Sequence, residues 1–399
     1  AYELLRWAIA RSQLNCLILR FRTYARLDVL RSWEFFVIRV GVDTGPLHGP
    51  MTGVGRAVED LVYQLRRHDD EVELTEYVLS FRAKLHANTR RLPFPAGITI
   101  KSWSHRDFPS VERHLPNVQI LHGMNYVVPP AKIPRLVTVY DCWALLNPTQ
   151  CSPVVKQAMN ALRRSVHTGA VIHASSRATA SVLRELFPHS RIEMIHLGAP
   201  QRRIAASSQR PETLLDIGHA PFIVAVGTVE KRKNYPRLIE AFAIAADENS
   251  DLQLVIAGSD GDDSPQVNKS LDALPSEIAR RVHLIGRVSD DNITWLYQHG
   301  VAMAYPSLDE GFGFPLLEAM SEQLPIVGST RGSIPEVAGA AAVLVEPDDV
   351  HALAQALAEV VNNSELRSRL QSAAVNQYAA FSWEKTAQAL INLYADLVK

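Results

Sequence analysis

Short runs of β-branched residues alternate with helical patterns in two successive series, and this alternation restricts the fold more than any other feature. In the first series, strands are expected at residues 36–42, 72–79, 119–121, 136–140, 171–174 and 192–195. In the second series, they are expected at 222–226, 252–257, 282–285, 301–305, 326–328 and 343–345. Such alternation predicts a parallel, doubly wound α/β sheet. Two series therefore predict two Rossmann-like domains, with a ligand cleft between the carboxyl edges of their sheets.

Changes in composition and in the pattern of strands and helices along the 399 residues indicate where the domains begin and end. We expect a basic helical extension at 1–34, a first Rossmann-like domain at 35–200, a polar linker at 201–218, a second Rossmann-like domain at 219–380 and a final helix at 381–399. The extension is rich in arginine and lacks the features of a signal peptide. A helix lying on a membrane surface and an extension without function are both consistent with it.

Composition excludes several classes of protein. With 47% hydrophobic and 21% charged residues, the chain is neither disordered nor fibrous. Its three cysteines (Cys16, Cys142 and Cys151) lack metal-like spacing, so we expect no disulfide framework or zinc module, and a reducing compartment fits best. Apolar runs stay well below the ~18 residues of a membrane-spanning helix. We therefore expect a soluble cytoplasmic protein, or one that touches a membrane only at its surface.

The charges are divided unevenly along the chain. Residues 1–205 hold 27 Lys and Arg against 16 Asp and Glu, whereas the remainder holds 14 against 26. The front part thus carries a net charge of +11 and the rest −12. A basic half often meets an anionic partner such as phosphate, nucleic acid or lipid headgroups, and mutual attraction between two packed domains explains the split equally well.

The segment 306–320 carries the most specific pattern in the sequence. Gly311 and Gly313 follow an expected strand and let the backbone approach a ligand closely. The free N–H groups of the next helical turn form an anion site. Glu310 and Glu318 flank that site, where carboxylates are suited to accepting hydrogen bonds from sugar or ribose hydroxyls.

This pattern resembles glycosyltransferase family 4, which comprises retaining enzymes of the GT-B fold with a Glu, seven residues, Glu signature in a Gly-Phe-Gly setting. The resemblance extends from about residue 37 to residue 399. Within the family, the chain is similar to mannosyltransferase-like enzymes of bacterial polysaccharide synthesis. It implies that Glu310 contacts the donor sugar and that Glu318 contacts the nucleotide ribose. It also implies that the intervening loop binds the donor (Gly311, Phe312, Gly313 and Phe314).

A cationic loop at 226–234 resembles the Gly-Thr…Arg-Lys-Asn loop of the same family. Breaking a sugar–diphosphate bond leaves charge on the departing phosphate, and cations held against it stabilise that transition state. Lys233 is the leading candidate for this role and Arg232 the second. Thr228, which stands where many members carry Arg, is expected to bind the donor.

In the first domain, Gly53 and Gly55 lie in a loop that resembles the one facing the donor diphosphate. Asp141 and His122 end strands at the cleft edge, and Asp141 could position the acceptor hydroxyl with His122 nearby. A structural cap or a satisfied buried polar role is equally consistent for each of these two. Tyr140 stands where many members have a His that contacts the donor sugar.

Two further segments complete the site prediction. The resemblance places the backbone near Arg287 beside the nucleotide base, and the turn 332–336 beside the donor.

Asp260 and Asp262 form an Asp-x-Asp in a polar loop that lacks further acidic ligands, so we expect a surface loop there and no metal.

Together these residues predict a retaining hexosyltransferase without a metal cofactor. It would transfer a hexose, with mannose as a candidate, from a nucleotide diphosphate sugar to a hydroxyl of a glycan or lipid-linked acceptor. The basic front part favours an anionic or lipid-linked acceptor at the cytoplasmic membrane face, and no nucleic-acid partner is expected. The alternatives are a sugar nucleotide epimerase or phosphorylase of GT-B shape, and an inactive nucleotide-sugar-binding subunit suggested by Tyr140 and Thr228.

Overall fold

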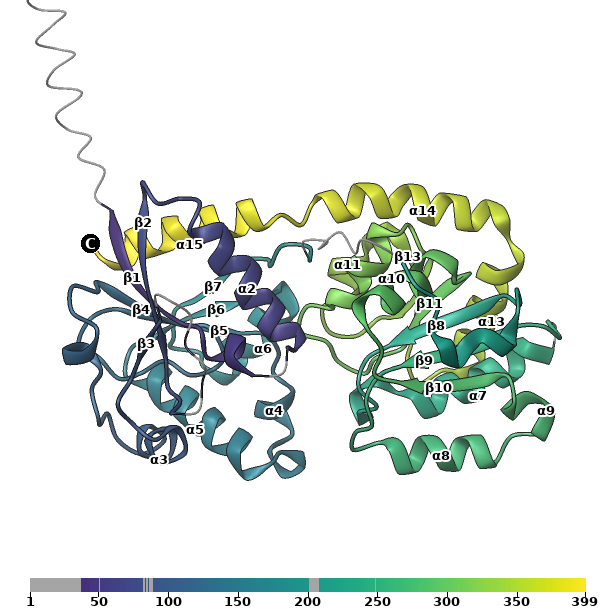
Figure 1. The fold of residues 1–399 in the computed structure, drawn as a ribbon, viewed down its shortest axis with the longest axis horizontal. Helices are drawn as coiled ribbons and strands as arrows, with labels where there is room; N and C mark the ends of the chain where they lie inside the picture. Colours follow the sequence, from purple (N-terminus) through teal and green to yellow (C-terminus); the bar gives the residue numbers. More distant parts are fainter. Residues whose placement is uncertain are drawn as a thin grey trace, which may run out of the picture.

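The computed structural model describes residues 37–49, 51–81, 83, 85, 89–200, 208–247 and 249–399. The expected basic extension at 1–34 and residues 201–207 of the expected linker lie outside the described residues. Figure 1 shows two α/β domains side by side, joined along one edge by the last two helices.

Seven parallel strands form the sheet of the first domain, in the order β3-β2-β1-β4-β5-β6-β7. They are β1 Ile38–Asp43, β2 Val72–Val78, β3 Arg90–Arg91, β4 Ile120–Gly123, β5 Arg135–Val139, β6 Val171–Ala174 and β7 Ile192–Met194. The helices are α2 Gly53–Leu65, α3 Ala96–Trp103, α4 Trp143–Leu146, α5 Pro153–His167 and α6 Arg177–Leu186. The strand order reverses at β1 and β4, which is the arrangement of a doubly wound sheet.

Six parallel strands form the second sheet, in the order β10-β9-β8-β11-β12-β13. They are β8 Phe222–Val226, β9 Gln253–Ala257, β10 Val282–Gly286, β11 Ala302–Tyr305, β12 Ile326–Ser329 and β13 Ala342–Val345. The helices are α7 Tyr235–Asp247, α8 Ser264–Asp272, α9 Ser276–Ala279, α10 Asp290–His299, α11 Phe314–Ser321, α12 Ile334–Ala338, α13 Val350–Asn362, α14 Ser364–Ala379 and α15 Trp383–Leu397. The predicted pair of doubly wound domains is confirmed.

The central strands are nearly continuous apolar runs because helices cover both faces of each sheet. Every residue of β5 and of β11 is buried, and four of the five residues of β8 are. This burial explains why these strands lack the alternating pattern of a sheet with one solvated face. The carboxyl ends of the central strands consequently carry the loops in which polar side chains can face a ligand.

The final helix, α15, packs against α2 and β1 of the first domain, while α14 packs against α11 of the second. The two helices run along one edge of the molecule and bring the carboxyl terminus back beside β1 (Figure 1). The last segment of the chain therefore spans both domains.

A continuous chain of hydrogen bonds fixes α15 to the first sheet. The carbonyl of Ile195 can only accept, so His173 Nε2 donates to it at 2.9 Å and His173 Nδ1 accepts from Thr138 Oγ1 at 2.9 Å. Thr138 then accepts from His122 Nε2 at 2.7 Å, and His122 Nδ1 accepts from the Tyr394 hydroxyl at 2.6 Å. Burial lowers the pKa of His173 to about 4 and that of His122 well below its ordinary value. Both rings are therefore neutral, and each ring nitrogen has a partner.

Among the described residues, no helix has the length and apolar character needed to cross a membrane.

Candidate active site

Glu310 follows β11, and its buried carboxylate lies between two cations of the loop after β8. Lys233 Nζ donates to Glu310 Oε1 at 2.6 Å, and Arg232 Nη1 lies 2.9 Å from Oε2. Lys233 Nζ also donates to the hydroxyl of Tyr305 at 3.0 Å. Although burial opposes it, the charges of Lys233 and Arg232 lower the pKa of Glu310 to about 2. The three side chains form an ionised cluster in the interior of the second domain, called here the Glu310 cluster.

The backbone around the Glu310 cluster is held by hydrogen bonds among the loops that follow β8, β11 and β13. Asn234 adopts a left-handed conformation (φ 60°), which Asn tolerates better than most residues. Its side-chain amide donates to the carbonyls of Pro306 at 3.2 Å and Pro347 at 2.8 Å. The Leu308 N–H donates to the carbonyl of Arg232 at 2.7 Å. These bonds fix the position of the two cations relative to Glu310.

The loop that follows Glu310 contacts the first domain directly. The Ser175 hydroxyl donates to the carbonyls of Tyr140 at 2.7 Å and Gly311 at 3.1 Å, and Thr179 bonds the same two carbonyls. A Cβ atom on Gly311 would lie 1.9 Å from the Tyr140 carbonyl oxygen. In this arrangement, only glycine at position 311 allows the two domains to approach this closely.

The aromatic residues of the same loop point into the protein. The side chain of Phe312, predicted as part of the donor-binding loop, is 4% exposed and makes edge-to-face contacts with Phe314 and Phe381 at ring distances of 5.3 and 5.6 Å. Gly313 has φ 87° and precedes the first turn of α11. Gly53 of the first domain faces Phe314 from α2, with 3.9 Å between a Cβ at Gly53 and the ring.

Asp141 lies at the carboxyl end of β5, where its charge interacts with the Glu310 cluster. Burial raises the pKa of Asp141, Glu310 raises it further, and the charge of Arg232 opposes both effects. Its Oδ1 also accepts from the Trp143 N–H at 3.0 Å, so Asp141 caps the first turn of α4 as well.

Asp309 is a residue of this junction that the sequence analysis missed, although it adjoins Glu310. Burial, together with the charges of Asp141 and Glu310, raises the pKa of Asp309 to about 6. Carboxylates of both domains therefore approach one another beside Arg232.

For His122, the structure matches the second of the two interpretations, that of a buried polar residue with its hydrogen bonds satisfied. Its side chain is fully buried, and both ring nitrogens are used in the hydrogen-bond chain that ends at Tyr394. It is thus a structural residue of the first domain and is not available at the cleft.

A pocket of about 580 Å³ lies between α2 of the first domain and α10 and α11 of the second. Glu318 lines it, and its Oε2 accepts from the Tyr297 hydroxyl at 3.1 Å. The Arg56 Nη1 lies 3.7 Å from Glu318 Oε1, and Arg56 also forms an ion pair with Asp290. Arg287 lines the same pocket and donates to the carbonyl of Met51 at 3.4 Å. The pocket therefore brings together Glu318, Arg287 and the start of α2.

Two other residues predicted to bind the donor, Gly55 and Thr228, are not part of the pocket lining. Gly55 is in the first turn of α2, where its N–H is capped by the Thr52 hydroxyl at 3.2 Å. Thr228 is exposed after β8, and its carbonyl accepts from the Glu230 N–H at 2.8 Å.

The Asp-x-Asp loop forms local hydrogen bonds. Asp262 accepts from the Lys231 N–H at 3.1 Å, and Asp260 accepts from the Ser264 hydroxyl at 3.2 Å. Across the described ranges, no group of three or more His, Cys, Asp or Glu side chains is arranged to hold a metal ion.

Comparison with known proteins identifies the class of this chain. Residues 211–377 match the family model described as glycosyl transferases group 1. O-antigen chain mannosyltransferase B of Escherichia coli is 26% identical over 383 residues, which cover 88% of this chain and 98% of the relative. The serotype-specific mannosyltransferase WbdA of Escherichia coli is 31% identical over 198 residues, covering 48% of this chain and 24% of WbdA.

Solved structures share the fold at low sequence identity. WaaG, a glycosyltransferase involved in lipopolysaccharide biosynthesis, superimposes with a TM-score of 0.63 at 14% identity, over 89% of this chain and 99% of WaaG. Sucrose-phosphate synthase from Thermosynechococcus elongatus gives a TM-score of 0.68 at 16% identity, over 90% and 99% of the two chains. The predicted GT-B fold is confirmed. The family-model match and the mannosyltransferase relatives are consistent with the resemblance to glycosyltransferase family 4 and identify the chain as a glycosyltransferase that uses a nucleotide sugar.

The burial of the Glu310 cluster yields a prediction for Lys233→Met. Removing one partner of a buried ion pair typically costs about 3–5 kcal/mol because the other charge is left uncompensated. We expect Lys233→Met to lower the free energy of unfolding by such an amount in urea titrations near neutral pH. The double variant Lys233→Met/Glu310→Gln should recover most of that stability without recovering sugar transfer. A single variant as stable as the wild type would contradict the ion pair.

Proposed function

We propose that this glycosyltransferase transfers mannose from GDP-mannose to a hydroxyl of a lipid-linked glycan, with retention of the anomeric configuration. The observation that carries the proposal is the ionised Glu310 cluster beside the pocket that contains Glu318. The mannosyltransferase relatives named above support mannose as the sugar.

The proposed roles follow from the charge of each group. Lys233 and Arg232 stabilise the negative charge that develops on the departing diphosphate, in a buried environment that strengthens electrostatic interactions. Glu310 accepts hydrogen bonds from hydroxyls of the transferred sugar, which replace those of the Tyr305 and Ser307 hydroxyls at its carboxylate. Glu318 accepts hydrogen bonds from the ribose. The acceptor attacks on the face from which the diphosphate leaves, and the leaving phosphate helps to take the acceptor proton.

The composition of the pocket supports guanine as the base. Besides Glu318, five carboxylates and two guanidinium groups line the pocket, those of Glu59, Asp60, Asp290, Asp291, Glu322, Arg56 and Arg287, so the lining carries more negative than positive charge. Guanine presents N1–H and N2–H donors on one edge, which one carboxylate can accept together. Uracil presents a single N–H between two carbonyl oxygens. A carboxylate that accepts from this N–H is repelled by the two oxygens, because they too are only acceptors. An acidic pocket therefore favours a GDP-sugar over a UDP-sugar.

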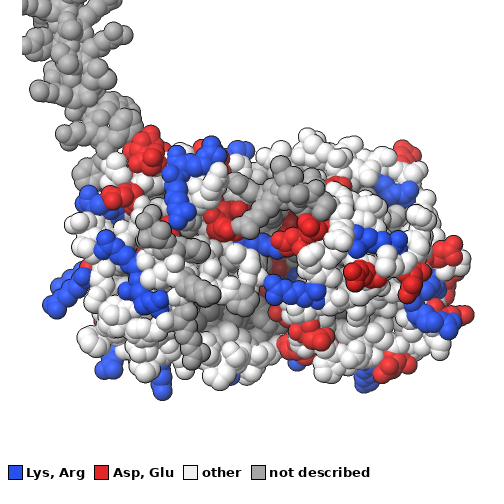
Figure 2. All heavy atoms as spheres, in the orientation of Figure 1, with Lys and Arg blue, Asp and Glu red and all other residues white. Residues whose placement is uncertain are grey.

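The surface of the first domain supports a lipid-linked acceptor. Three large apolar side chains are exposed on α3, in the loop after it and on α5 of this domain: Ile98 (72%), Phe108 (64%) and Val154 (70%). Lys101 and Lys156 are exposed on the same helices. Lys and Arg side chains also occupy the outer edge and lower face of this domain in Figure 2. Apolar side chains flanked by cations suit the interface of a membrane that contains anionic lipid. We propose that the enzyme works at the cytoplasmic membrane surface.

The transfer reaction can be tested with the two glutamates. We expect release of GDP from GDP-mannose that depends on an added mannosyl-lipid acceptor, and little release of UDP from UDP-sugars. Glu310→Gln should lower transfer by ~10²-fold while retaining GDP affinity. Glu318→Gln should weaken GDP binding by roughly 1.5–3 kcal/mol in calorimetry, as expected for a hydrogen bond to a charged group.

The control for this test is Glu359→Gln on α13, outside the pocket, which should match the wild type. Equal losses of GDP affinity in Glu310→Gln and Glu318→Gln would contradict the division of roles. Nucleotide release without any acceptor would favour an epimerase or phosphorylase, and absence of turnover with retained binding would favour an inactive subunit.

Membrane attachment predicts a salt-dependent affinity for lipid. The intact chain should sediment with vesicles of phosphatidylcholine and phosphatidylglycerol at low ionic strength, and less as salt screens charges beyond about 10 Å at ~0.1 M. Lys101→Glu/Lys156→Glu should reduce this binding several-fold, since each cation near an anionic surface contributes about 1 kcal/mol. Lys269→Glu on α8 of the second domain is the matched control. Equal binding of all three proteins, or none by the wild type at low salt, would refute the membrane proposal and favour a soluble acceptor.

A further inference from the structure

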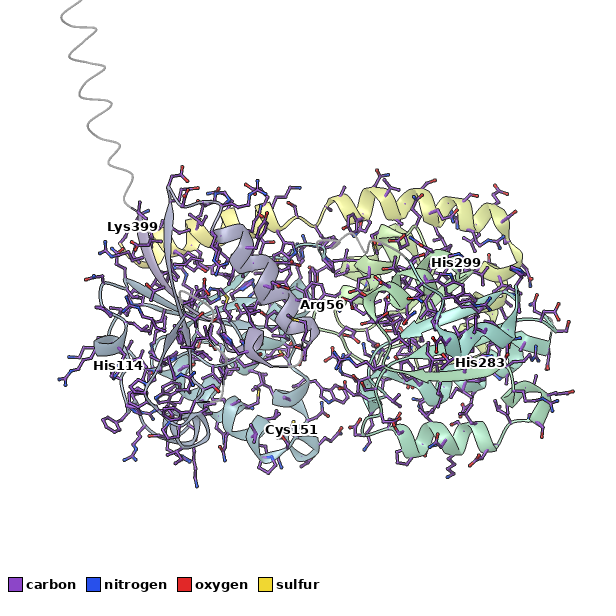
Figure 3. All side chains as sticks on the ribbon, in the orientation of Figure 1. Arg56, His114, Cys151, His283, His299 and Lys399 are labelled. Carbon is purple, nitrogen blue, oxygen red and sulfur yellow. The ribbon has the colours of Figure 1, made fainter. Side chains whose placement is uncertain are left out.

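Arg56 connects the two domains at the nucleotide pocket. It projects from the first turns of α2, where the domains meet (Figure 3). One guanidinium nitrogen pairs with Asp290 at the start of α10, and Nη1 lies 3.7 Å from Glu318 Oε1. The side chain is 43% exposed, so a ligand entering the pocket can reach it. Neither carboxylate belongs to the domain of Arg56, and this ion pair therefore exists only while the domains are in contact.

The carboxylate of Glu318 depends on this arginine for its charge. Burial raises the pKa of Glu318, and the charge of Asp290 raises it further. Three groups oppose that effect: Arg56 from α2, the hydroxyl of Tyr297 from α10, and Lys233 from the loop after β8. Arg56 has the largest effect of the three. Since Lys233 is already paired with Glu310 at 2.6 Å, Arg56 is the cation whose removal most affects Glu318.

The geometry points to Arg56 as a positioning residue for the nucleotide, which keeps Glu318 ionised and directed into the pocket and ties this state to contact between the domains. This inference rests on the proposed function, because it assigns the ribose to Glu318. An ionised carboxylate accepts hydrogen bonds from two vicinal hydroxyls through its two oxygens. A protonated carboxyl group carries an O–H donor on one of these oxygens, and that O–H needs an acceptor of its own. Nucleotide affinity should therefore follow the ionisation of Glu318.

Removal of the arginine charge should make nucleotide binding sensitive to pH. With Arg56 replaced by Gln, burial is opposed only by Tyr297 and Lys233, and the pKa of Glu318 rises. Binding needs the ionised form, so affinity is retained above that raised pKa and is lost as the pH falls through it. Below the raised pKa, the loss approaches tenfold for each unit of pH. A purely structural role of Arg56 would weaken binding by the same factor at every pH.

A second arginine of the same segment supplies the control. Arg66 follows the last residue of α2 and forms an ion pair with Glu76, which lies within the first domain. Arg66→Gln therefore removes an arginine charge and an ion pair without touching the pocket. Arg56→Lys keeps the positive charge and should restore most of the effect of Arg56→Gln.

The experiment is calorimetric titration of the full chain with GDP at about pH 8 and about pH 6, a range in which His is the only unperturbed side chain to titrate. Affinities are expressed relative to the wild type at the same pH, which cancels titration of GDP itself. We expect the relative affinity of Arg56→Gln to be lower at about pH 6 than at about pH 8, while the relative affinities of Arg66→Gln and Arg56→Lys stay near the wild-type value at both.

The outcomes separate this inference from the function on which it rests. If the wild type binds GDP and Arg56→Gln loses the same factor of affinity at both pH values, or loses none, the role of Arg56 is overturned. The proposed function is then intact. A folded wild type that binds neither GDP nor UDP overturns the proposed function and the inference with it. A loss in Arg66→Gln equal to that in Arg56→Gln also overturns the inference, because the effect would then belong to α2 as a whole.

Discussion

The buried carboxylate of Glu310 is the interaction on which the arrangement of this protein depends. It binds Lys233 and Arg232, so it joins the loop after β8 to the loop after β11 inside the second domain. The residue that follows, Gly311, lies against the carbonyl of Tyr140 in the first domain. Because a buried carboxylate is stable only with its partners in place, the same ion pairs that hold two cations ready for a diphosphate also fix the loop at the domain contact.

Two further carboxylates of the second domain strengthen that contact. Glu336 accepts hydrogen bonds from the N–H groups of Arg177 at 2.9 Å and Ala178 at 3.4 Å, at the N-terminus of α6, where a negative charge is favoured. Glu336 also pairs with His196, and Asp290 pairs with Arg56 at the nucleotide pocket. Some of the excess cations in residues 1–205 thus form ion pairs with the second domain. Mutual attraction between the two domains was one of the two explanations of the uneven charge distribution, the other being an anionic partner. The exposed cations of α3 and α5 are not used in this way and remain available to an external anionic surface.

Much of the fold and the centre of the site could be predicted from sequence because their signals are local. Strands buried on both faces are apolar runs. Lys233 and Glu310 lie in loops that follow such strands, and Glu318 lies in the helix that follows the second loop. The sequence left the position of His122 open, because a histidine at the end of a strand is found both in ligand clefts and in hydrophobic cores. The partner that decides for His122, Tyr394, lies 272 residues away in the sequence. Arg56 was overlooked for the same reason, since Asp290 is 234 residues away.

The central claim is that a nucleotide sugar binds across both domains at the Glu310 cluster and the pocket of Glu318. Hydrogen–deuterium exchange with and without GDP-mannose tests this claim most directly, because it reports which backbone segments a bound donor protects. Protection is predicted in three segments that are distant in sequence: 51–58 of the first domain, and 227–234 and 306–320 of the second. Protection confined to one domain, or to segments other than these, would contradict the account.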